Sequence, residues 1–427
     1  GRRPTSSGGG GGGGGSSGGS SSGGSSSGDG GEAAERLLAE MGLKEPLPWQ
    51  CLMNDVVLEA PGQLPPEVLA SLPPGVQVLD KKKVSDGWHE GYLLTLSEPL
   101  RPGQEPKAIL RIWRSQLSYW RPDTPTGWAV ELRAITLARQ AGIPTAGCQR
   151  PPTAPTSGNG GDSGTDGEGS YVGVCARAPR GEACDWAIYD FVPHCGEEEA
   201  HRHVLATAGS HTKFIVQHMA KLHALDLTHV NTEPLARFDS WREHLDYLAA
   251  LARESEQEDV ARAVQGVRAA LESAGVPDLP PALCHFDWHL GNALCDDEGR
   301  LQAVIDLEFA GVGDPRLDLA RHCRLERWTG DVVCRDRGSD RDTAEIWRSY
   351  AAARFGADAD AVLRLGPPGP WLAFECAVVL VVGTSVCVRA AQLQSGVQGV
   401  FLPRCDLGEW AEDMETARWH LRRMGIL

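Results

Sequence analysis

The stretch Cys284–His322, CHFDWHLGNALCDDEGRLQAVIDLEFAGVGDPRLDLARH, carries the pattern that decides the fold of this chain. Asp287 follows a short apolar segment, ALCHF, and Asn292 comes five residues after it. Asp306 follows fourteen residues later, near the end of a second apolar segment, LQAVIDL. If the two segments form antiparallel strands that lie side by side, the three polar side chains come together at one end of the strand pair. We therefore expect one site built from these three residues.

The three residue types suit phosphoryl transfer, in which the protein mainly positions the reactants and neutralises charge. Mg²⁺ prefers hard oxygen ligands such as carboxylates and amide carbonyls, and Asp306 and Asn292 supply them. Asp287 is then the carboxylate that remains to align an attacking hydroxyl. Its main task would be alignment, with the proton moving late.

The pattern H-x-D-x-x-x-x-N is short, but its surroundings make it specific. The chain has only four asparagines, and one of them falls at the required position. The segment GVGDPRLDLA then follows Asp306. Asp and Asn are also common in turns and caps, so a purely structural role is the alternative interpretation. The intact spacing favours the site.

With His285, Asp287 and Asn292, this stretch resembles the catalytic loop of the aminoglycoside phosphotransferases and the related choline, homoserine and fructosamine kinases. Asp306 matches their metal-binding Asp. The resemblance is strongest over residues 282–322 and extends over roughly residues 76–400. It implies an α+β, bilobal protein-kinase-like fold with an antiparallel-sheet N-lobe, a mainly helical C-lobe, and ATP or GTP bound between them.

The resemblance implies a small-molecule kinase that uses Mg²⁺ to move the γ-phosphoryl of ATP or GTP onto a hydroxylated acceptor. Phe286 replaces the Arg of the protein-kinase H-R-D motif, and no A-P-E segment is visible, which disfavours a protein acceptor. The alternative is a pseudokinase that binds nucleotide, or acts as a scaffold, without turnover. The complete Asp/Asn/Asp set argues against it.

In the segment KAILRIW, Arg111 falls where protein kinases carry the Lys that holds the nucleotide phosphates. Arg also contacts phosphate, but it is not equivalent to Lys. Glu131, on the next expected helix, would be its ion-pair partner. A solvated strand-edge charge for Arg111 and a surface position for Glu131 are the alternatives.

Two further N-lobe segments match the family less closely. The loop SDGWHEG, Ser85–Gly91, occupies the phosphate-covering position without the full G-x-G-x-x-G pattern. The segment Ala187–Val192 matches the hinge strand. Its backbone at Asp190 and Val192 would meet the nucleotide base.

Three other polar residues and one acidic run are expected to have structural roles. His285 would hydrogen-bond backbone under the loop, Asp318 would brace the loop from the helix that begins near Leu317, and His223 would pack. The run Glu197–Glu199 suits a helix start, where carboxylates are favoured. A pocket for a cationic acceptor is the alternative interpretation of that run.

The order of patterns predicts strands first and helices later, which indicates an α+β chain. Residues 5–31 are almost wholly Gly and Ser and cannot bury enough apolar surface to order themselves. The expected divisions are a disordered tail (1–31), an uncertain N-terminal extension (32–75), an N-lobe (76–193) with a disordered insert (155–170), and a helical C-lobe (194–427). The expected strands cover 76–85, 91–97, 107–113, 171–178 and 187–193, and the expected helices cover 126–141, 213–225, 241–252 and 258–275.

Composition narrows the partners and the location. The formal net charge of −16 disfavours nucleic acid, whose phosphates it would repel. The apolar stretch Cys376–Val388 is shorter than the about 20 residues that a membrane span needs, so we expect a buried helix or strand. The 12 cysteines form no C-x-x-C pair and no signal-peptide pattern opens the chain, which favours reduced thiols and a cytoplasmic location. Arg2, Arg3 and the Ser-rich run leave an organelle-targeting remnant open.

Overall fold

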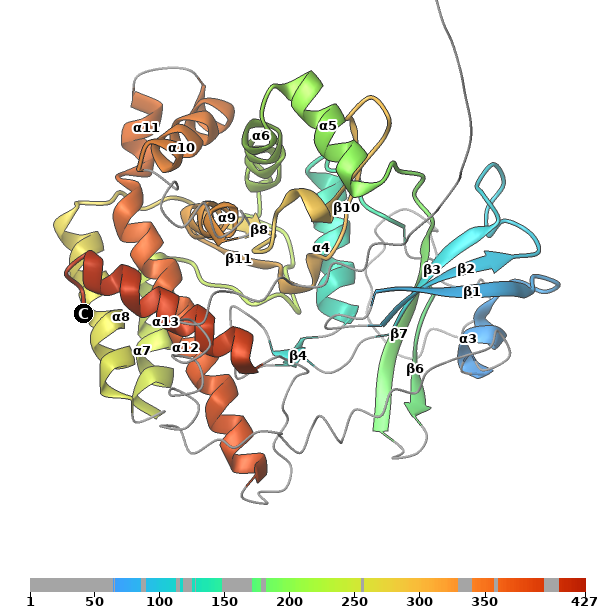
Figure 1. Ribbon diagram of the computed structural model, residues 1–427, viewed down its shortest axis with the longest axis horizontal. Coiled ribbons are helices and arrows are strands. Elements are labelled where there is room, and N and C mark those ends of the chain that lie inside the picture. The colour runs from blue at the N-terminus through green and yellow to red at the C-terminus, as the bar shows by residue number, and fades with distance from the viewer. Residues whose placement is uncertain are drawn as a thin grey trace, which may run out of the picture.

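The computed structural model describes residues 64, 66–85, 90–112, 116–117, 125–126, 128–147, 171–177, 182–254, 257–328, 340–356, 360–394 and 407–427. The expected tail, the insert at 155–170 and the middle of the loop Ser85–Gly91 lie outside the described residues, as does most of the extension at 32–75. A strand-rich N-lobe lies beside a helical C-lobe (Figure 1). The expected α+β, bilobal architecture is confirmed.

The N-lobe is built on one antiparallel sheet with the strand order β1-β2-β3-β7-β6. Alternate side chains of β2 and β3 are buried, as expected for strands with one covered face. Val68 of helix α3 and Leu72, which follows the helix, belong to the same apolar cluster, so the packed lobe begins before residue 76. The strands are β1 (Val78–Ser85), β2 (Glu90–Leu96), β3 (Lys107–Ile112), β6 (Tyr171–Arg177) and β7 (Glu182–Asp190), and α3 covers Pro66–Ser71.

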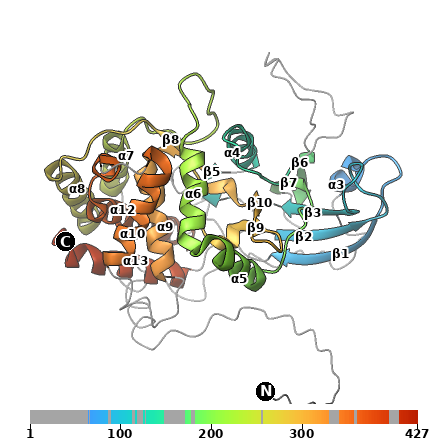
Figure 2. The same ribbon diagram turned by 90° about the horizontal axis from the view of Figure 1, so that it is seen from above.

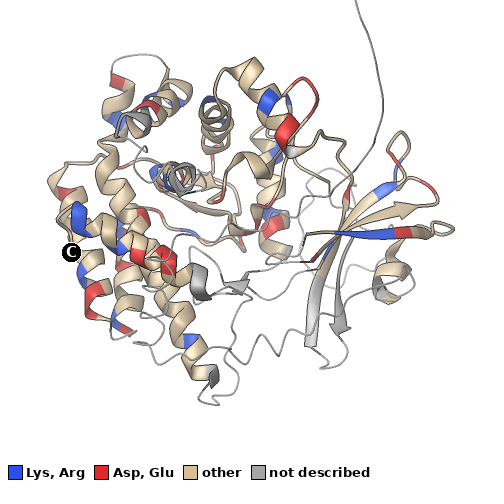
Figure 3. Cartoon of the chain, viewed as in Figure 1, with Lys and Arg blue, Asp and Glu red and all other residues tan. Residues whose placement is uncertain are grey.

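The edge strand β1 carries the chain's one lysine run, Lys81, Lys82 and Lys83, which colours this strand blue in Figure 3. Charged residues on an edge strand discourage the pairing of its open side with another chain. The run is therefore explained by its place in the sheet. The expected hairpin of β1 and β2 is confirmed by their antiparallel register.

Helix α4 (Trp128–Gln140) lies between the sheet and the C-lobe (Figures 1 and 2). Its buried residues Ala134, Leu137 and Ala138 belong to the apolar cluster of the C-lobe. The helix is followed by Gly142 at a φ of 74°, a left-handed position that glycine adopts at little cost. The helix therefore ends where the Gly-Ile-Pro sequence predicts.

The C-lobe is a helical body around α12, and the apolar stretch Cys376–Val388 lies within this helix. The stretch Asp360–Gln392 holds a helix that is apolar and long enough to cross a membrane, but 83% of its most apolar window is buried inside the protein. Such burial is typical of a core helix. The C-lobe helices are α5 (Glu197–Ala208), α6 (His211–His223), α7 (Trp241–Glu254), α8 (Glu258–Ser273), α9 (Pro315–Trp328), α10 (Asp340–Phe355), α11 (Asp360–Leu365), α12 (Pro368–Gln394) and α13 (Leu407–Arg423).

The strand pairing expected around Asp287 and Asp306 is wrong in one respect. Strand β8 (Ala282–Cys284) pairs with β11 (Gly311–Gly313), and β10 (Leu301–Val304) pairs with β9 (Ala293–Cys295). The two expected strands therefore each pair with a three-residue partner and not with each other. Segments this short show no periodicity, so the sequence could not reveal the partners.

Six cysteines in the described part of the chain are free and buried: Cys195, Cys284, Cys295, Cys323, Cys376 and Cys387. Burial raises the pKa of the Cys284 thiol well above its usual value, and it raises that of Cys387 to about 12. Thiols held in this way are poor nucleophiles. They serve as small apolar core residues.

Candidate active site

Asp287 lies on a loop whose backbone is held from below by Asp318 of α9. The two oxygens of Asp318 accept hydrogen bonds from the backbone N–H groups of His285 and Phe286, each at 2.9 Å. Asp318 in turn accepts a hydrogen bond from His223 Nε2 at 3.0 Å, and His223 Nδ1 lies 2.6 Å from the Tyr350 hydroxyl. The expected bracing role of Asp318 and the packed position of His223 are confirmed by these contacts.

The imidazole of His285 joins the two halves of the site. Its Nε2 donates to the carbonyl of Ile305 at 3.0 Å, and its Nδ1 accepts from the Asp287 backbone N–H at 3.2 Å. The Ile305 N–H donates to the Asn292 carbonyl at 3.0 Å. Backbone hydrogen bonds thus link the Asp287 loop to the segment that carries Asp306, as strand pairing was expected to do.

Two non-glycine residues in the site have left-handed backbone angles. Phe286 has a φ of 68° and Asp306 has a φ of 64°. Such a conformation costs on the order of 1–3 kcal/mol for a residue with a side chain, and it persists only where the surroundings enforce it. The strain falls on the residue before Asp287 and on Asp306 itself.

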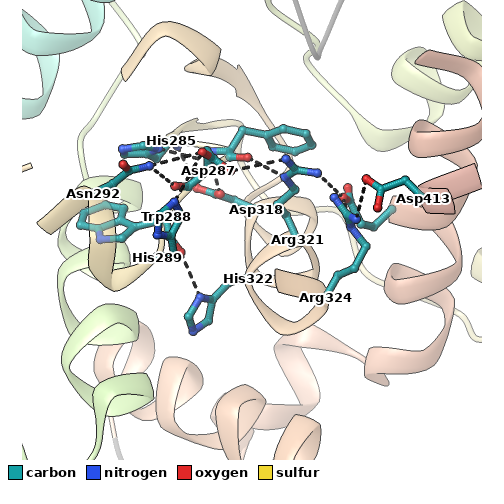
Figure 4. A network of polar contacts seen from close by, with 12 residues as sticks. His285, Asp287, Trp288, His289, Asn292, Asp318, Arg321, His322, Arg324 and Asp413 are labelled. Atoms are coloured by element: carbon teal, nitrogen blue, oxygen red, sulfur yellow. Dashed lines mark hydrogen bonds and ion pairs between the residues drawn. The ribbon is translucent and has the colours of Figure 1, made fainter. Parts of the chain in front are cut away.

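Asp287 and Asn292 are in direct contact (Figure 4). Asn292 Nδ2 donates to the backbone carbonyl of Asp287 at 2.8 Å and to its Oδ2 at 3.3 Å. Asn292 is buried, while 19% of the Asp287 side chain is exposed. The amide is therefore fixed and the carboxylate stays within reach of a ligand.

Arg111 joins the sheet to this loop. Its Nη1 lies 3.2 Å from Glu131 Oε1, so the ion pair expected between β3 and α4 is present. Its Nη2 lies 2.5 Å from Asp306 Oδ1 and 2.5 Å from Glu308 Oε2. Only 16% of the Arg111 side chain is exposed, which contradicts the alternative of a solvated edge charge. Glu131 is likewise buried and not on the surface.

The pKa shifts reflect this crowding of charge. Burial acts to lower the pKa of Arg111, but Asp306, Glu131 and Glu308 together raise it well above its usual value. Burial raises the pKa of Glu131 to about 7, and its ion pair with Arg111 offsets only part of that rise. Arg111 is thus permanently cationic, whereas Glu131 exchanges a proton near neutral pH.

The expected hinge residues lie at the end of β7. The backbone N–H of Asp190 donates to the carbonyl of Gly147 at 2.7 Å, and the Asp190 carboxylate lies 3.6 Å from Arg101. The carbonyl of Val192 accepts from His194 Nδ1 at 2.7 Å. The N–H of Asp190 is therefore engaged within the protein, and a base-binding role for these two residues stays a prediction.

A family model described as "Phosphotransferase enzyme family" matches residues 84–359. The match spans more than half of the 427 residues and includes every residue of the site described above. This chain belongs to the phosphotransferase enzyme family. The search of the curated proteins found no match.

The chain is also similar in structure to several solved phosphotransferases. A thermostable mutant of aminoglycoside phosphotransferase APH(4)-Ia shares 14% identity at a TM-score of 0.46, with 82% of this chain and 96% of that chain covered. A putative aminoglycoside phosphotransferase from Ralstonia eutropha JMP134 shares 13% identity at a TM-score of 0.47, with coverage of 81% and 92%. Macrolide 2'-phosphotransferase type I shares 16% identity at a TM-score of 0.44, with coverage of 84% and 96%.

In a phosphotransferase of this family, the donor set fits a divalent cation. Three carboxylates, from Glu131, Asp306 and Glu308, lie around Arg111. Asn292 adds an amide next to the segment of Asp306. Oxygen ligands of these kinds suit Mg²⁺. The residues present therefore fit the expected ion.

Glu308 was missed from the sequence, although it lies only two residues after Asp306. A single Glu between apolar residues carries no spacing signal of its own. In the structure its side chain is buried and bonded to Arg111. Its acidic character within an otherwise apolar stretch, Leu307–Ala310, was the available clue.

A second polar cluster lies beneath the loop and has a structural role. His223, Cys284 and Asp318 bring potential ligand atoms within 4.8 Å of one another. Both nitrogens of His223 and both oxygens of Asp318 already take part in hydrogen bonds within the protein. These bonds explain the cluster without a metal.

Proposed function

We propose that this protein transfers the γ-phosphoryl of ATP or GTP to a hydroxyl of a small molecule. One observation carries the proposal: Asn292 bonds to Asp287 and, through its carbonyl, to the N–H of Ile305, and the next residue, Asp306, pairs with Arg111, so that all four residues belong to one connected site. Phosphoryl transfer requires an aligned acceptor, oxygen ligands for a metal and a cation for the phosphates. The site supplies all three functions in one place.

Asp287 would align the acceptor hydroxyl and take its proton late in the transfer. Its side chain is partly exposed, and Asn292 and the loop backbone restrict its orientation. A carboxylate held in this way reduces the entropy lost when the acceptor reaches the phosphate. An ordinary carboxylate is sufficient for this aligning role of Asp287.

Arg111 would contact the nucleotide phosphates from β3. The planar guanidinium has several donors in a fixed arrangement, and it pairs well with phosphate oxygens. Glu131 steadies it from α4 at 3.2 Å. Glu308 is a second partner that steadies Arg111, and its side chain is buried away from solvent.

Asn292 and Asp306 would hold Mg²⁺. The ion would supply charge neutralisation on the phosphate oxygens, which otherwise repel the approaching hydroxyl. The carboxylates of Asp306 and Glu308, which lie together beside Arg111, support this assignment. The acceptor would contact the C-lobe, and we propose a hydroxylated small molecule such as an amino alcohol, a sugar or an aminoglycoside-like amine.

A nucleotide-binding pseudokinase is the second candidate, and one observation favours it. Arg111 stands at the Lys position and is paired directly with Asp306, the expected metal ligand. Phosphate and metal would have to separate that pair. The presence of Asp287 in contact with Asn292 argues for turnover, since nucleotide binding alone does not require the Asp287 carboxylate.

The test is nucleotide consumption with Mg²⁺, ATP or GTP and a panel of hydroxylated amines, sugars and amino alcohols. Asp287→Asn and Asp287→Ala are measured alongside, with nucleotide binding by calorimetry. We expect acceptor-dependent turnover that falls at least about 100-fold in both variants while binding persists. Turnover retained in both variants would contradict the role of Asp287. Mg²⁺-dependent binding without turnover for any acceptor would favour the pseudokinase.

A further inference from the structure

Helix α9 presents three charged residues, Asp318, Arg321 and Arg324, at intervals of three toward the interior of the protein. Residues three apart lie on the same side of a helix. All three are buried, which is uncommon for charged side chains unless they are paired. Asp318 braces the backbone of the catalytic loop, so the two arginines require a separate explanation.

Arg321 contacts the catalytic loop at two points (Figure 4). Its Nε donates to the carbonyl of Phe286 at 2.9 Å, and its Nη2 lies 3.4 Å from Asp287 Oδ1. The centre of the guanidinium lies 5.7 Å from the centroid of the Phe286 ring. One side chain thus holds both the peptide before Asp287 and the Asp287 carboxylate.

Residues of α9 bond to both backbone polar groups of Phe286, the N–H and the carbonyl. Its N–H donates to Asp318, and its carbonyl accepts from Arg321, each at 2.9 Å. His322 adds a bond from Nδ1 to the carbonyl of Trp288 at 3.0 Å. These contacts explain how a bulky residue keeps a left-handed φ of 68°.

The two oxygens of Asp287 are held by different partners. Asn292 contacts Oδ2 at 3.3 Å, and Arg321 contacts Oδ1 at 3.4 Å. Asn292 comes from the same loop, whereas Arg321 comes from the body of the C-lobe. Arg321 therefore ties the carboxylate to the rigid part of the protein.

Glu375, on α12, is a further hydrogen-bond partner of Arg321. Its Oε1 lies 3.2 Å from Arg321 Nη1 and 2.9 Å from Arg324 Nε. Arg324 also lies 3.7 Å from Asp413 of α13. Arg324 shares the Glu375 partner but points away from Asp287 in Figure 4, so it is a matched control for Arg321.

We propose that Arg321 is a positioning residue for phosphoryl transfer, which fixes the Asp287 carboxylate and the strained Phe286 peptide in the geometry that aligns the acceptor. The inference rests on the proposed function. Arg321 lies outside the Asp/Asn/Asp pattern, and it reaches Asp287 from helix α9. The guanidinium fork is required because three separate acceptors lie around it.

The activity test compares Arg321→Gln, Arg321→Lys and the control Arg324→Gln, with the acceptor that gives turnover in the wild type. We expect kcat to fall on the order of 10- to 100-fold in Arg321→Gln, since misplacement by about 1 Å has an effect of that size. The KM for nucleotide should change less than about threefold, because Arg321 contacts Phe286, Asp287 and Glu375, whereas the proposed phosphate contact is Arg111. Arg321→Lys should recover part of kcat, and Arg324→Gln should keep most of it.

The stability test needs no acceptor. Melting temperatures are measured for Arg321→Gln, Asp287→Asn and the double variant, and for the matching set with Arg324→Gln. We expect the loss of melting temperature caused by Arg321→Gln to be at least about 2 °C smaller when Asp287 is Asn, because the ion pair of Arg321 with Asp287 has already been removed. The Arg324→Gln loss should be equal in both backgrounds.

The results separate the inference from the proposed function. A wild type without turnover for any acceptor contradicts the proposed function, and the melting temperatures then still decide whether Arg321 and Asp287 are coupled. Equal losses for Arg321→Gln in both backgrounds overturn the inference. Equal kcat values for Arg321→Gln and Arg324→Gln overturn it as well, because both variants lose a Glu375 partner and only one loses Asp287.

Discussion

Arg111 Nη2 lies 2.5 Å from Asp306 Oδ1, so the residue expected to hold phosphate is paired directly with the residue expected to hold metal. They come from different lobes and are 195 positions apart in sequence. A divalent cation at Asp306 would compete with the Arg111 contact, and phosphates beside Arg111 would compete with the Asp306 contact. Metal and nucleotide are therefore expected to bind together more readily than either does alone.

Asp306→Asn should separate these two effects. The variant keeps the side-chain size but loses the negative charge, so Mg²⁺ should no longer strengthen nucleotide binding, and turnover should fall at least about 100-fold. Calorimetry with AMP-PNP, with Mg²⁺ and with EDTA, measures this directly. Binding in EDTA should be equal to the wild type or tighter, because Arg111 has lost one competing carboxylate. A full Mg²⁺ effect in the variant would contradict the metal assignment.

Arg111→Lys should weaken nucleotide binding on the order of tenfold. One ammonium cannot contact Glu131, Asp306 and Glu308 together, whereas the guanidinium fork reaches all three. Lys107→Arg is the control, because Lys107 lies on the same strand with an exposed partner, Glu105. Unchanged affinity in Arg111→Lys would show that the phosphates do not use this residue.

Asp318→Asn should destabilise the fold by about 3 kcal/mol, because it replaces an acceptor of two backbone N–H groups by a group that is itself partly a donor. The fall should appear in the free energy of unfolding from urea titration. Glu345→Gln, at an exposed position on α10, is the control and should change stability by less than about 0.5 kcal/mol. A loss confined to kcat, without a change in stability, would show that the bracing is unimportant for folding.

Glu375→Gln tests the buried contact between Glu375 of α12 and Arg321 of α9 through the pH dependence of stability. Burial raises the pKa of Glu375 from 4.5 to about 8, and Arg321 offsets only part of that rise. The folded protein therefore binds this proton more tightly than the unfolded chain does. The contribution to stability is present in full below pH 4.5 and is lost as the pH rises through about 8.

The difference in unfolding free energy, wild type minus Glu375→Gln, should accordingly fall across that window by up to about 1.4 kcal/mol per pH unit. The variant keeps the shape and an oxygen that accepts from Arg321 and Arg324. Taking the difference removes the contribution of Glu131, whose pKa is also raised, whereas Asp413 shares Arg324 with Glu375 and belongs to the same titrating group. Parallel pH curves for the two proteins would show that Glu375 titrates alike in the folded and unfolded states.

Much of the fold and part of the site could be predicted from local pattern. The spacing of Asp287, Asn292 and Asp306 indicated one site, because the chemistry needs those groups on short, consecutive segments. Alternating and helical periodicity located the N-lobe hairpin and helix α4 to within a few residues. The ion pair of Arg111 with Glu131 was implied by the resemblance to the kinase pattern, and it is present in the structure.

The sequence thus predicted the fold class and the candidate residues of the site, from the order of its segments, the spacing of Asp287, Asn292 and Asp306, and the resemblance that these residues carry. Only the tertiary structure decided the strand partners β9 and β11, the burial of Glu308 and the contact of Arg321 with Asp287. These features join segments without a periodic signal, and they arise when α9 and α12 pack beneath the loop. Burial then selects pairing between distant charges, because a charged group removed from water is stable only beside its partner.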